Sequence, residues 1–308
     1  MKTRITCALS SFLLLMLASV VSFSQVKPAV VEIPFDFYRN EIILQVKVNG
    51  KGPFNMMLDT GTDPSTIELS TARELGLKLI PLGTPPVGGG TAPRTVYGVY
   101  LPSIEVGGEV GMLAAKNVEA VAIDLSKISE RLGKPLQGVI GHSVLKGRVV
   151  QIDYPNRVVR FYSKSPFAGV KQANTAKRTV LPFRYVDNVL IDDVFVNGKK
   201  IVGNFDTGSN GMFDLTPAAI ALLGMEDEVK QALGSSDVGY NGVSENKKGK
   251  LTNVTIGGIS VDAPEVVFFG KGTGRDKKPW GINIGNVFLK DFVVTIDYRR
   301  KLITLERP

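Results

Sequence analysis

Residues 57–61 read Met-Leu-Asp-Thr-Gly, and residues 204–208 read Asn-Phe-Asp-Thr-Gly. In each stretch an apolar segment typical of a β-strand ends at an acidic residue, Asp59 in the first and Asp206 in the second. Burying a carboxylate there costs free energy unless the group is paired or hydrogen-bonded. Two such sites in one chain therefore indicate that Asp59 and Asp206 lie together.

The two stretches occupy equivalent places in an internal repeat of about half the chain. A repeat on this scale is far longer than the periods of solenoid proteins. The order of the matched segments indicates a duplicated unit. The matches are residues 33–35 with 181–183, 48–51 with 196–199, 87–91 with 238–242, 101–108 with 251–258, 138–146 with 281–290, and 149–154 with 293–298.

The turn residues of each unit predict β-structure. Asn-Gly at 49–50 and at 197–198 separates β-rich runs, which is the signature of a tight hairpin. The return strand of each hairpin then carries the Asp-Thr-Gly motif. A short helix follows each motif, one over residues 71–75 capped by Ser70 and one over residues 217–223 capped by Thr216. The fold class is therefore all-β with a few short helices.

The N-terminal segment is typical of a secretory signal peptide. Lys2 and Arg4 precede an apolar run over residues 5–21, and small residues follow at 22–24. We predict cleavage before Gln25 and export to the periplasm or the extracellular space. A retained membrane anchor is the alternative, but the run is short for a span and is interrupted by polar residues. No other stretch is long and apolar enough to cross a bilayer.

The scarcity of cysteine and histidine narrows the chemistry. Cys7 is the one cysteine and leaves with the signal peptide, so the mature chain has no disulfide and no thiolate. His142 is the one histidine, which argues against a Ser-His-Asp triad and a His-pair zinc site. We predict no metal and no cofactor. The groups left for catalysis are carboxylates, hydroxyls and lysines.

The positive charge does not predict a nucleic-acid partner. The formal net charge is +8, and much of the excess lies in two glycine-containing runs at 246–250 and 271–278. A nucleic-acid surface would combine a basic face with interleaved aromatic residues, and neither run has that pattern. We predict that both runs are solvated loop tips.

A twofold axis near the two motifs would place Asp59 and Asp206 side by side. Two carboxyl groups about 3 Å apart cannot both ionise readily, so they share a proton. The ionised group can take a proton from a water held between them, and the protonated group can donate to the carbonyl that the water attacks. This is general acid–base hydrolysis of an amide without a covalent enzyme intermediate.

The neighbouring residues suit this role. Gly61 and Gly208 allow tight turns that present amides to the carboxylates. Thr60 and Thr207 can bond across the axis to the backbone of the opposite lobe. Two glycine-rich segments could form hairpins that close over an extended peptide. The candidates for these flaps are Gly88, Gly89, Gly90, Gly239 and Tyr240.

From residue 33 to the C-terminus, these motifs resemble the retropepsin-like aspartic proteases. The shared order is apolar-Asp-Thr-Gly, a flap-like hairpin, and an apolar-apolar-Gly segment before a short helix. Two copies in one chain resemble the bilobed pepsin type. The resemblance implies two β-barrel lobes related by a pseudo-twofold axis. It also implies Asp59 and Asp206 as the catalytic pair, a framework of Thr60, Gly61, Thr207 and Gly208, and peptide bonds as the substrate.

Several positions depart from the pepsin pattern. Thr-Asp-Pro-Ser-Thr at 62–66 follows the first motif in place of Ser with a nearby Trp, and Asp63 adds a charge near the pair. Asn283 stands where the first repeat has Val139. The flap tyrosine has two candidates, Tyr97 in the first lobe and Tyr240 in the second. These departures point to the bacterial retropepsin-like proteins.

The domain boundaries follow from the repeat. We predict a signal peptide at 1–24, an N-terminal lobe at 25–164, a linker at 165–178 and a C-terminal lobe at 179–308, with the lobes pairing inside a monomer.

Other singled-out residues have simpler interpretations. A single Asp-Thr-Gly is often an ordinary turn, and His142 is expected at a helix start or the surface. Asp153 and Asp297 are expected to cap turns, and Tyr240 to pack in its hairpin.

The function that these observations favour is an exported aspartic endopeptidase acting on a peptide or protein. One alternative is a catalytically silent module of the same fold that binds extended peptides. Another is an exported structural protein that uses the motifs only as turns.

Overall fold

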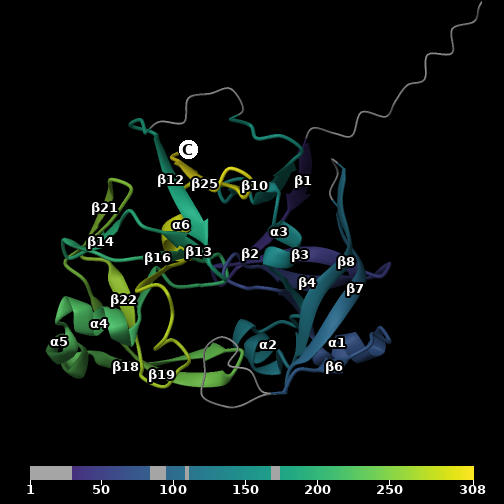
Figure 1. Cartoon of the computed structure of the whole chain (residues 1–308), viewed down its shortest axis with the longest axis horizontal. Helices are drawn as coiled ribbons and strands as arrows, with labels where there is room; N and C mark the ends of the chain where they lie inside the picture. Colours follow the sequence, from purple (N-terminus) through teal and green to yellow (C-terminus); the bar gives the residue numbers. More distant parts are fainter. Residues whose placement is uncertain (1–29, 84–94, 108–110, 168–173) are drawn as a thin grey trace, which may run out of the picture.

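Strands dominate the structure and gather in two lobes, as the all-β prediction requires. The computed structural model describes residues 30–83, 95–107, 111–167 and 174–308. In Figure 1 the first lobe runs from purple to teal on one side, and the second lobe runs from green to yellow on the other. None of the helices in these described ranges is long and apolar enough to cross a membrane.

The first lobe is a closed barrel. Six strands follow one another in the order β3-β4-β9-β5-β8-β7, and β7 pairs with β3 to close the ring. Short strands β2 and β6 extend it. The strands are β2 (Asp36–Tyr38), β3 (Glu41–Val48), β4 (Lys51–Leu58), β5 (Ser65–Glu68), β6 (Ile80–Pro81), β7 (Tyr97–Gly107), β8 (Met112–Ile123) and β9 (Gly138–Ile140).

The second lobe has the same central arrangement in two sheets. Its main strands run β13-β16-β23-β17-β22-β19-β18, and a smaller sheet runs β15-β14-β20-β21. The strands are β13 (Val189–Ile191), β14 (Val194–Val196), β15 (Lys199–Lys200), β16 (Gly203–Phe205), β17 (Phe213–Leu215), β18 (Leu233–Gly239), β19 (Gly242–Lys250), β20 (Asn253–Ile256), β21 (Ile259–Asp262), β22 (Glu265–Phe269) and β23 (Ile282–Ile284).

A central sheet joins the lobes. Its strands run β1-β11-β10-β24-β25-β12, and β12 continues into the second lobe by pairing with β13. At its middle β10 and β24 are antiparallel, with Gln151 opposite Thr295. Figure 1 shows this sheet above the two lobes. Its strands are β1 (Val30–Pro34), β10 (Val149–Asp153), β11 (Val158–Tyr162), β12 (Arg178–Tyr185), β24 (Val293–Asp297) and β25 (Leu302–Glu306).

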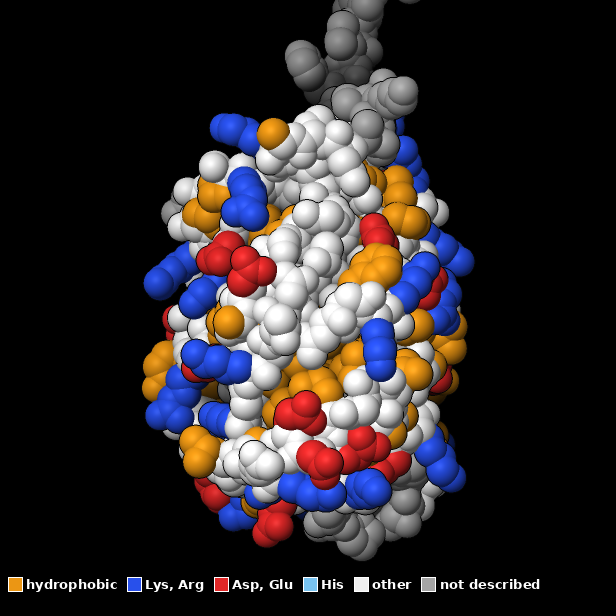
Figure 2. Space-filling model, turned by 90° about the vertical axis from the view of Figure 1, so that its left-hand side faces the viewer, with side chains coloured by type: hydrophobic (Ala, Val, Ile, Leu, Met, Phe, Trp, Pro, Cys, Tyr) orange, Lys and Arg blue, Asp and Glu red, His pale blue; other side chains and the backbone are white. Residues whose placement is uncertain are grey.

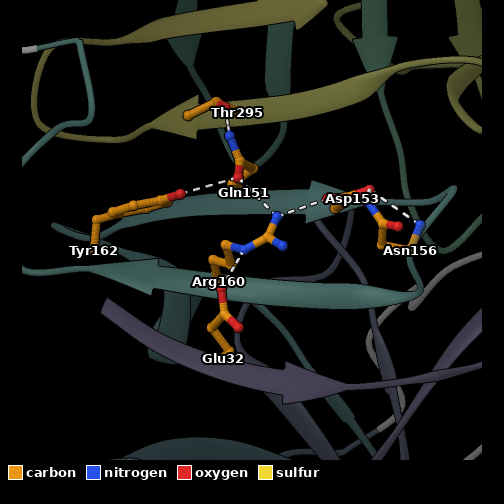
Figure 3. A network of polar contacts seen from close by, with 7 residues as sticks. All are labelled: Glu32, Gln151, Asp153, Asn156, Arg160, Tyr162 and Thr295. Carbon is orange, nitrogen blue, oxygen red and sulfur yellow. Dashed lines mark hydrogen bonds and ion pairs between the residues drawn. The ribbon is translucent and has the colours of Figure 1, made fainter. Parts of the chain in front are cut away.

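A polar network crosses the central sheet, as Figure 3 shows. Arg160 lies 2.6 Å from Glu32 on β1 and 2.7 Å from Asp153 on β10. Gln151 donates from Nε2 to Thr295 Oγ1 at 3.0 Å, which ties β10 to β24. Burial opposes the charge on Asp153, but the Arg160 hydrogen bond holds the pKa of that carboxyl below its usual value. The network therefore links strands of both halves of the chain.

The motif strands have matching neighbours in the two lobes. In the first lobe β9 lies parallel to β4 and antiparallel to β5. In the second lobe β23 lies parallel to β16 and antiparallel to β17. The predicted Asn-Gly turns are present, with positive φ at residues 49–50 and 197–198. The second return strand is split into β15 and β16.

Short helices occupy the predicted places, with one correction. The second-lobe helix α4 begins with Pro217 and is capped by Thr216, whose side chain accepts from Ala219 N. In the first lobe Glu68 caps α1, because its carboxylate reaches the backbone N–H of Ser70. The predicted Ser70 cap is therefore wrong. The helices are α1 (Leu69–Glu74), α2 (Ser126–Leu132), α3 (His142–Leu145), α4 (Pro217–Leu223), α5 (Glu226–Gln231) and α6 (Asn286–Leu289).

One of the two basic runs is not a loop. Residues 246–250 lie on β19 between β18 and β22, and Asn246 in this run is buried. The run alternates between exposed and less exposed positions, as a strand does. The run at 271–278 connects β22 to β23 without regular structure, as predicted, but Arg275 and Lys278 in it are half-buried and not fully solvated. On the face in Figure 2, Lys and Arg side chains are interspersed with Asp and Glu.

Candidate active site

Both motif aspartates follow directly after central strands. Asp59 follows β4 and donates its backbone N–H to Ile140 O at 3.0 Å. Asp206 follows β16 and donates to Ile284 O at 3.0 Å. Because the strands around each motif are buried and paired on both sides, the backbone at the two carboxyl groups is held rigidly.

The two motif threonines tie the lobes together. Thr60 donates from its hydroxyl to Phe205 O at 2.8 Å, and Thr207 donates from its hydroxyl to Leu58 O at 3.0 Å. Each threonine hydroxyl also accepts the other's backbone N–H, at 3.0 and 3.1 Å. Both side chains are buried. These four reciprocal bonds relate the motifs by a local twofold symmetry.

Each motif glycine lies against the carboxyl group of the opposite lobe. A Cβ atom built on Gly208 would lie 2.2 Å from Asp59 Cγ, and one built on Gly61 would lie 2.7 Å from Asp206 Oδ1. Real Cβ contacts are never this close. The glycines are therefore required by the close approach of the lobes, because a side chain at either position would push the carboxyl groups apart.

The Asp59 carboxyl is buried and electrostatically linked to Asp206. Burial, and next the charge of Asp206, raise the pKa of Asp59 to about 8. Hydrogen bonds from Thr62 and from the Gly61 N–H act in the opposite direction. At neutral pH the pair therefore holds one proton between the two carboxyl groups.

Asp206 is surrounded by amide donors. It accepts from Gly208 N at 2.9 Å and from Asn283 Nδ2 at 3.0 Å. Asn283 lies on β23 and also donates to Asp214 Oδ2 at 3.2 Å, while its own Oδ1 accepts from Asn204 at 2.7 Å. Asp206 therefore has an amide donor from β23, while the second donor to Asp59 is the Thr62 hydroxyl. In the sequence, the signal for this group of hydrogen-bonded polar residues is Asn283, which stands where the first repeat has Val139.

Tyr240 reaches the site from the second lobe. It lies at the turn between β18 and β19, and its hydroxyl is 3.2 Å from Thr62 Oγ1. Its ring packs against a first-lobe apolar cluster that includes Met57 and Val139. The hairpin thus spans from the second lobe to the first, and Figure 1 shows it extending toward α2. Gly239 lines the same cleft.

The other flagged residues lie in different places. Gly88, Gly89 and Gly90 are outside the described residues. Tyr97 lies on β7 opposite Pro81 and Ala122. Among the described residues, Tyr97 does not line the cleft.

Residues near the first motif have structural contacts. Asp63 accepts a hydrogen bond from the Tyr185 hydroxyl at 2.8 Å. His142 begins α3 and stacks on Tyr185, with ring centroids 3.7 Å apart. Asp153 and Asp297 accept backbone N–H groups of the turns that follow them, as predicted.

Sequence reasoning missed two residues beside the pair. Asn188 donates from Nδ2 to Gly61 O at 3.1 Å, which adds a further bond between the lobes. Glu41 begins β3 and lines the cleft with its side chain buried. Burial, followed by Asp59 and Asp206, raises the pKa of Glu41 well above its usual value. Asn188 and Glu41 are single polar residues near the starts of strands, and no sequence motif distinguishes them from polar residues on the surface.

Comparison with known proteins agrees with the motifs. Residues 44–144 match the family described as aspartyl protease. The matched segment contains the first Asp-Thr-Gly motif and covers about a third of the chain. No curated protein matches it. Among solved structures it is similar to Basic 7S globulin from soybean, with 10% identity, a TM-score of 0.48, and coverage of 90% of this chain and 94% of that one. It is also similar to a retropepsin-like aspartic protease from Rickettsia conorii, with 20% identity, a TM-score of 0.34, and coverage of 42% and 90%.

The cleft has room for part of an extended chain. It is lined by the dyad residues and encloses about 360 Å³. Its lining comes from both lobes, with Met57 and Val139 on one side and Asn204 and Asn283 on the other. The cleft therefore holds two carboxyl groups, and its two sides differ in polarity.

Proposed function

We propose that this protein is an aspartic endopeptidase that hydrolyses peptide bonds with a water activated between Asp59 and Asp206. The observation that carries the proposal is the contact of each motif glycine with the opposite carboxyl group, which leaves room for one shared site and not two separate turns. The reciprocal threonine bonds support it by fixing that geometry. The match of residues 44–144 to the aspartyl protease family supports the reaction class.

The unlike surroundings assign the two carboxyl groups different roles. Asp206, with two N–H donors, acts as the base that takes a proton from the water. Asp59, whose pKa is raised to about 8, donates its proton to the peptide carbonyl oxygen. The water oxygen bonds to the carbonyl carbon and gives a tetrahedral diol.

Collapse of the diol completes the reaction. The proton now on Asp206 passes to the amide nitrogen, the C–N bond breaks, and the amine leaves. One hydroxyl of the diol returns its proton to Asp59 as the new carboxyl group forms. The pair therefore ends the cycle with the one proton with which it began, and no covalent enzyme intermediate is needed.

The test is cleavage of an unfolded protein from acidic to neutral pH. We expect Asp59→Asn and Asp206→Asn each to reduce the rate at least 10²- to 10⁴-fold, roughly the contribution of positioned acid–base groups. Asp291→Asn, at an exposed position, is the matched control and should cleave like the wild type. Cleavage that survives either dyad substitution would contradict the assignment. Saturable peptide binding without cleavage would favour the silent peptide-binding module.

We further propose that the protein is exported and acts as a monomer outside the cytoplasm. Residues 1–24 support export through their positive start, apolar run and small final residues. Both aspartates come from one chain, which supports a monomer. Mass spectrometry of the protein secreted by a bacterial host should find Gln25 at the N-terminus, and light scattering should give a monomer mass. An uncleaved N-terminus in the membrane fraction would indicate the retained anchor instead.

A further inference from the structure

The second-lobe side of the cleft carries a row of buried polar residues. Asn204, Asn283 and Asp214 lie side by side on β16, β23 and β17. All three line the cleft, and each is less than a tenth exposed. They are joined by hydrogen bonds from Asn204 to Asn283 and from Asn283 to Asp214. A row of this kind is costly to bury unless its polar atoms are satisfied.

Polar atoms on this side remain unpaired. Asn204 Oδ1, Trp280 Nε1 and Arg275 Nη1 are buried and have no hydrogen-bond partner among the described residues. The three side chains line the same cleft, and Asn204 and Trp280 are 1% and 7% exposed. An unsatisfied buried polar group costs about 1–3 kcal/mol. One acceptor and two donors without partners therefore lie on side chains that line the cleft.

The charges on this side nearly balance. Arg275 and Lys278 line the cleft together with Asp214 and Asp237. Arg275 lies 4.0 Å from Asp237 and 3.8 Å above the ring of Phe269, so its guanidinium is held in place. An entering carboxylate would meet the aspartates and leave Asn204 Oδ1 unpaired. An entering ammonium would meet both cations and leave the Trp280 and Arg275 donors unpaired.

A group that binds here must be neutral, and it must both donate and accept hydrogen bonds. A carboxamide meets these two requirements, because it is uncharged and has an NH₂ donor and an oxygen acceptor. We propose that this side of the cleft is a specificity pocket for a glutamine or asparagine side chain next to the scissile bond. The amide NH₂ donates to Asn204 Oδ1, and the amide oxygen accepts from Trp280 Nε1 and Arg275. The inference rests on the proposed endopeptidase function and adds the substrate class.

The first-lobe side has the opposite character. Met57 and Val139 occupy there the places that Asn204 and Asn283 hold in the second lobe. They belong to an apolar cluster with Ile43. Neighbouring side chains of an extended peptide point in opposite directions. The carboxamide preference should therefore appear on one side of the scissile bond and an apolar preference on the other.

The experiment uses peptides that differ at one position, before or after the scissile bond, with Gln, Glu, Met or Lys. For the wild-type protein we expect kcat/KM for Gln to exceed that for each of the other three about tenfold or more, on one side only, as a satisfied polar pocket discriminates. Equal rates, or a preference for Met, Glu or Lys on both sides, would overturn the proposal.

Two variants locate the preference. Trp280→Phe keeps the ring and removes the Nε1 donor, and Asn204→Met introduces the side chain that the first lobe has at Met57. Each should lower the Gln-to-Met ratio of kcat/KM about tenfold while the protein still melts cooperatively. Leu222→Met, at an exposed site on α4, is the control and should keep the wild-type ratio. If both variants fold and both keep the wild-type Gln-to-Met ratio of kcat/KM, the proposal is overturned. If neither variant folds, the rates of the wild-type protein on the four peptides decide.

Binding separates this inference from the proposed function. If the wild type cleaves no peptide, the endopeptidase proposal fails, and the same peptides are measured by fluorescence anisotropy. Tighter binding of the Gln peptide than of the Met, Glu and Lys peptides would still support the pocket. Equal affinities would overturn it.

Discussion

The two lobes place the same three-strand row beside their aspartates but fill it with different side chains. In the first lobe the row is Met57, Val139 and Thr66. In the second lobe it is Asn204, Asn283 and Asp214. All six side chains are buried, so the difference is one of chemistry and not of position.

This difference shows how a symmetric backbone supports an asymmetric pair. The first lobe offers Asp59 a mostly apolar wall, and burial is the largest cause of its raised pKa. The second lobe offers Asp206 an amide donor from the row itself, Asn283. The backbone brings two like carboxyl groups together, and the row gives them different neighbours. Acid and base roles are separated in this way when two environments differ.

Replacing the motif glycines should give the largest effect. In Gly208→Ala the new Cβ would lie 2.2 Å from Asp59 Cγ, and in Gly61→Ala it would lie 2.7 Å from Asp206 Oδ1. We expect each variant to lose about 10²-fold or more in peptide cleavage, since displacing reacting groups by about 1 Å costs that much. Gly208→Ala should be the more severe, and kcat/KM measures both.

The controls are glycines with open space around them. Gly107 in the first lobe and Gly234 in the second have no atom within 4 Å of a built Cβ. Alanine at these positions should leave cleavage unchanged. If Gly208→Ala were as active as these controls, the carboxyl groups could not be as close as described.

Replacing Asn283, the middle residue of the second-lobe row, should have an intermediate effect on peptide cleavage. Asn283→Val removes the donor at 3.0 Å from Asp206 Oδ2, and hydrogen bonds to charged groups contribute about 1.5–3 kcal/mol. We therefore expect kcat/KM to fall about tenfold or more, with a changed pH profile.

The reciprocal change tests the first lobe. Val139→Asn buries an amide in an apolar cluster and should lower the free energy of unfolding by about 1–3 kcal/mol in urea denaturation. Because position 139 is equivalent to position 283, the new amide would lie on the Asp59 side of the cleft, and the pH profile should change in this variant too. If instead Asn283→Val left the pH profile unchanged, the row would not control the dyad.

The smallest effect should come from Tyr240→Phe. This change removes only the hydroxyl 3.2 Å from Thr62 Oγ1 and keeps the ring in the first-lobe cluster. A single neutral hydrogen bond contributes about 0.5–1.5 kcal/mol, so we expect kcat/KM to fall by a factor of about 2–10. A loss as large as that of Gly208→Ala would mean that Tyr240 does more than hold the hairpin across the cleft.

The fold class and the pairing of the motifs could be predicted because they depend on local patterns. Asn-Gly turns fix the hairpins at 49–50 and 197–198, and the Asp-Thr-Gly stretches recur at equivalent places. The Thr216 cap was predictable for the same reason, since a cap and the proline after it are adjacent in sequence.

Contacts that depend on strand register could not be predicted. The row of Asn204, Asn283 and Asp214 spans three strands whose alignment no local pattern gives. The Glu68 cap was missed because the helix begins at Leu69, which places Ser70 inside its first turn and leaves Glu68 to accept the Ser70 N–H. The run at 246–250 was predicted as a loop because lysine and glycine are rare in strands. It is nevertheless a strand, because it pairs with a neighbouring strand on each edge.

The pair's shared proton also predicts how stability depends on pH. The pKa of Asp59 is raised in the folded protein from about 3.8 to about 8, so between these values the folded state holds a proton that the unfolded state releases. The contribution of this group to stability is fully present below its unfolded pKa and is lost as the pH rises through about 8. Urea denaturation should show a shallower decline over this window for Asp59→Asn than for the wild type.

A titration of the Asp59 carboxyl by ¹³C NMR tests the central claim most directly, in the wild type and in Asp206→Asn. The paired geometry predicts a midpoint near pH 8 in the wild type, and a lower one when the Asp206 charge is removed. A midpoint near pH 4 that is the same in both proteins would show that the two carboxyl groups do not share a site.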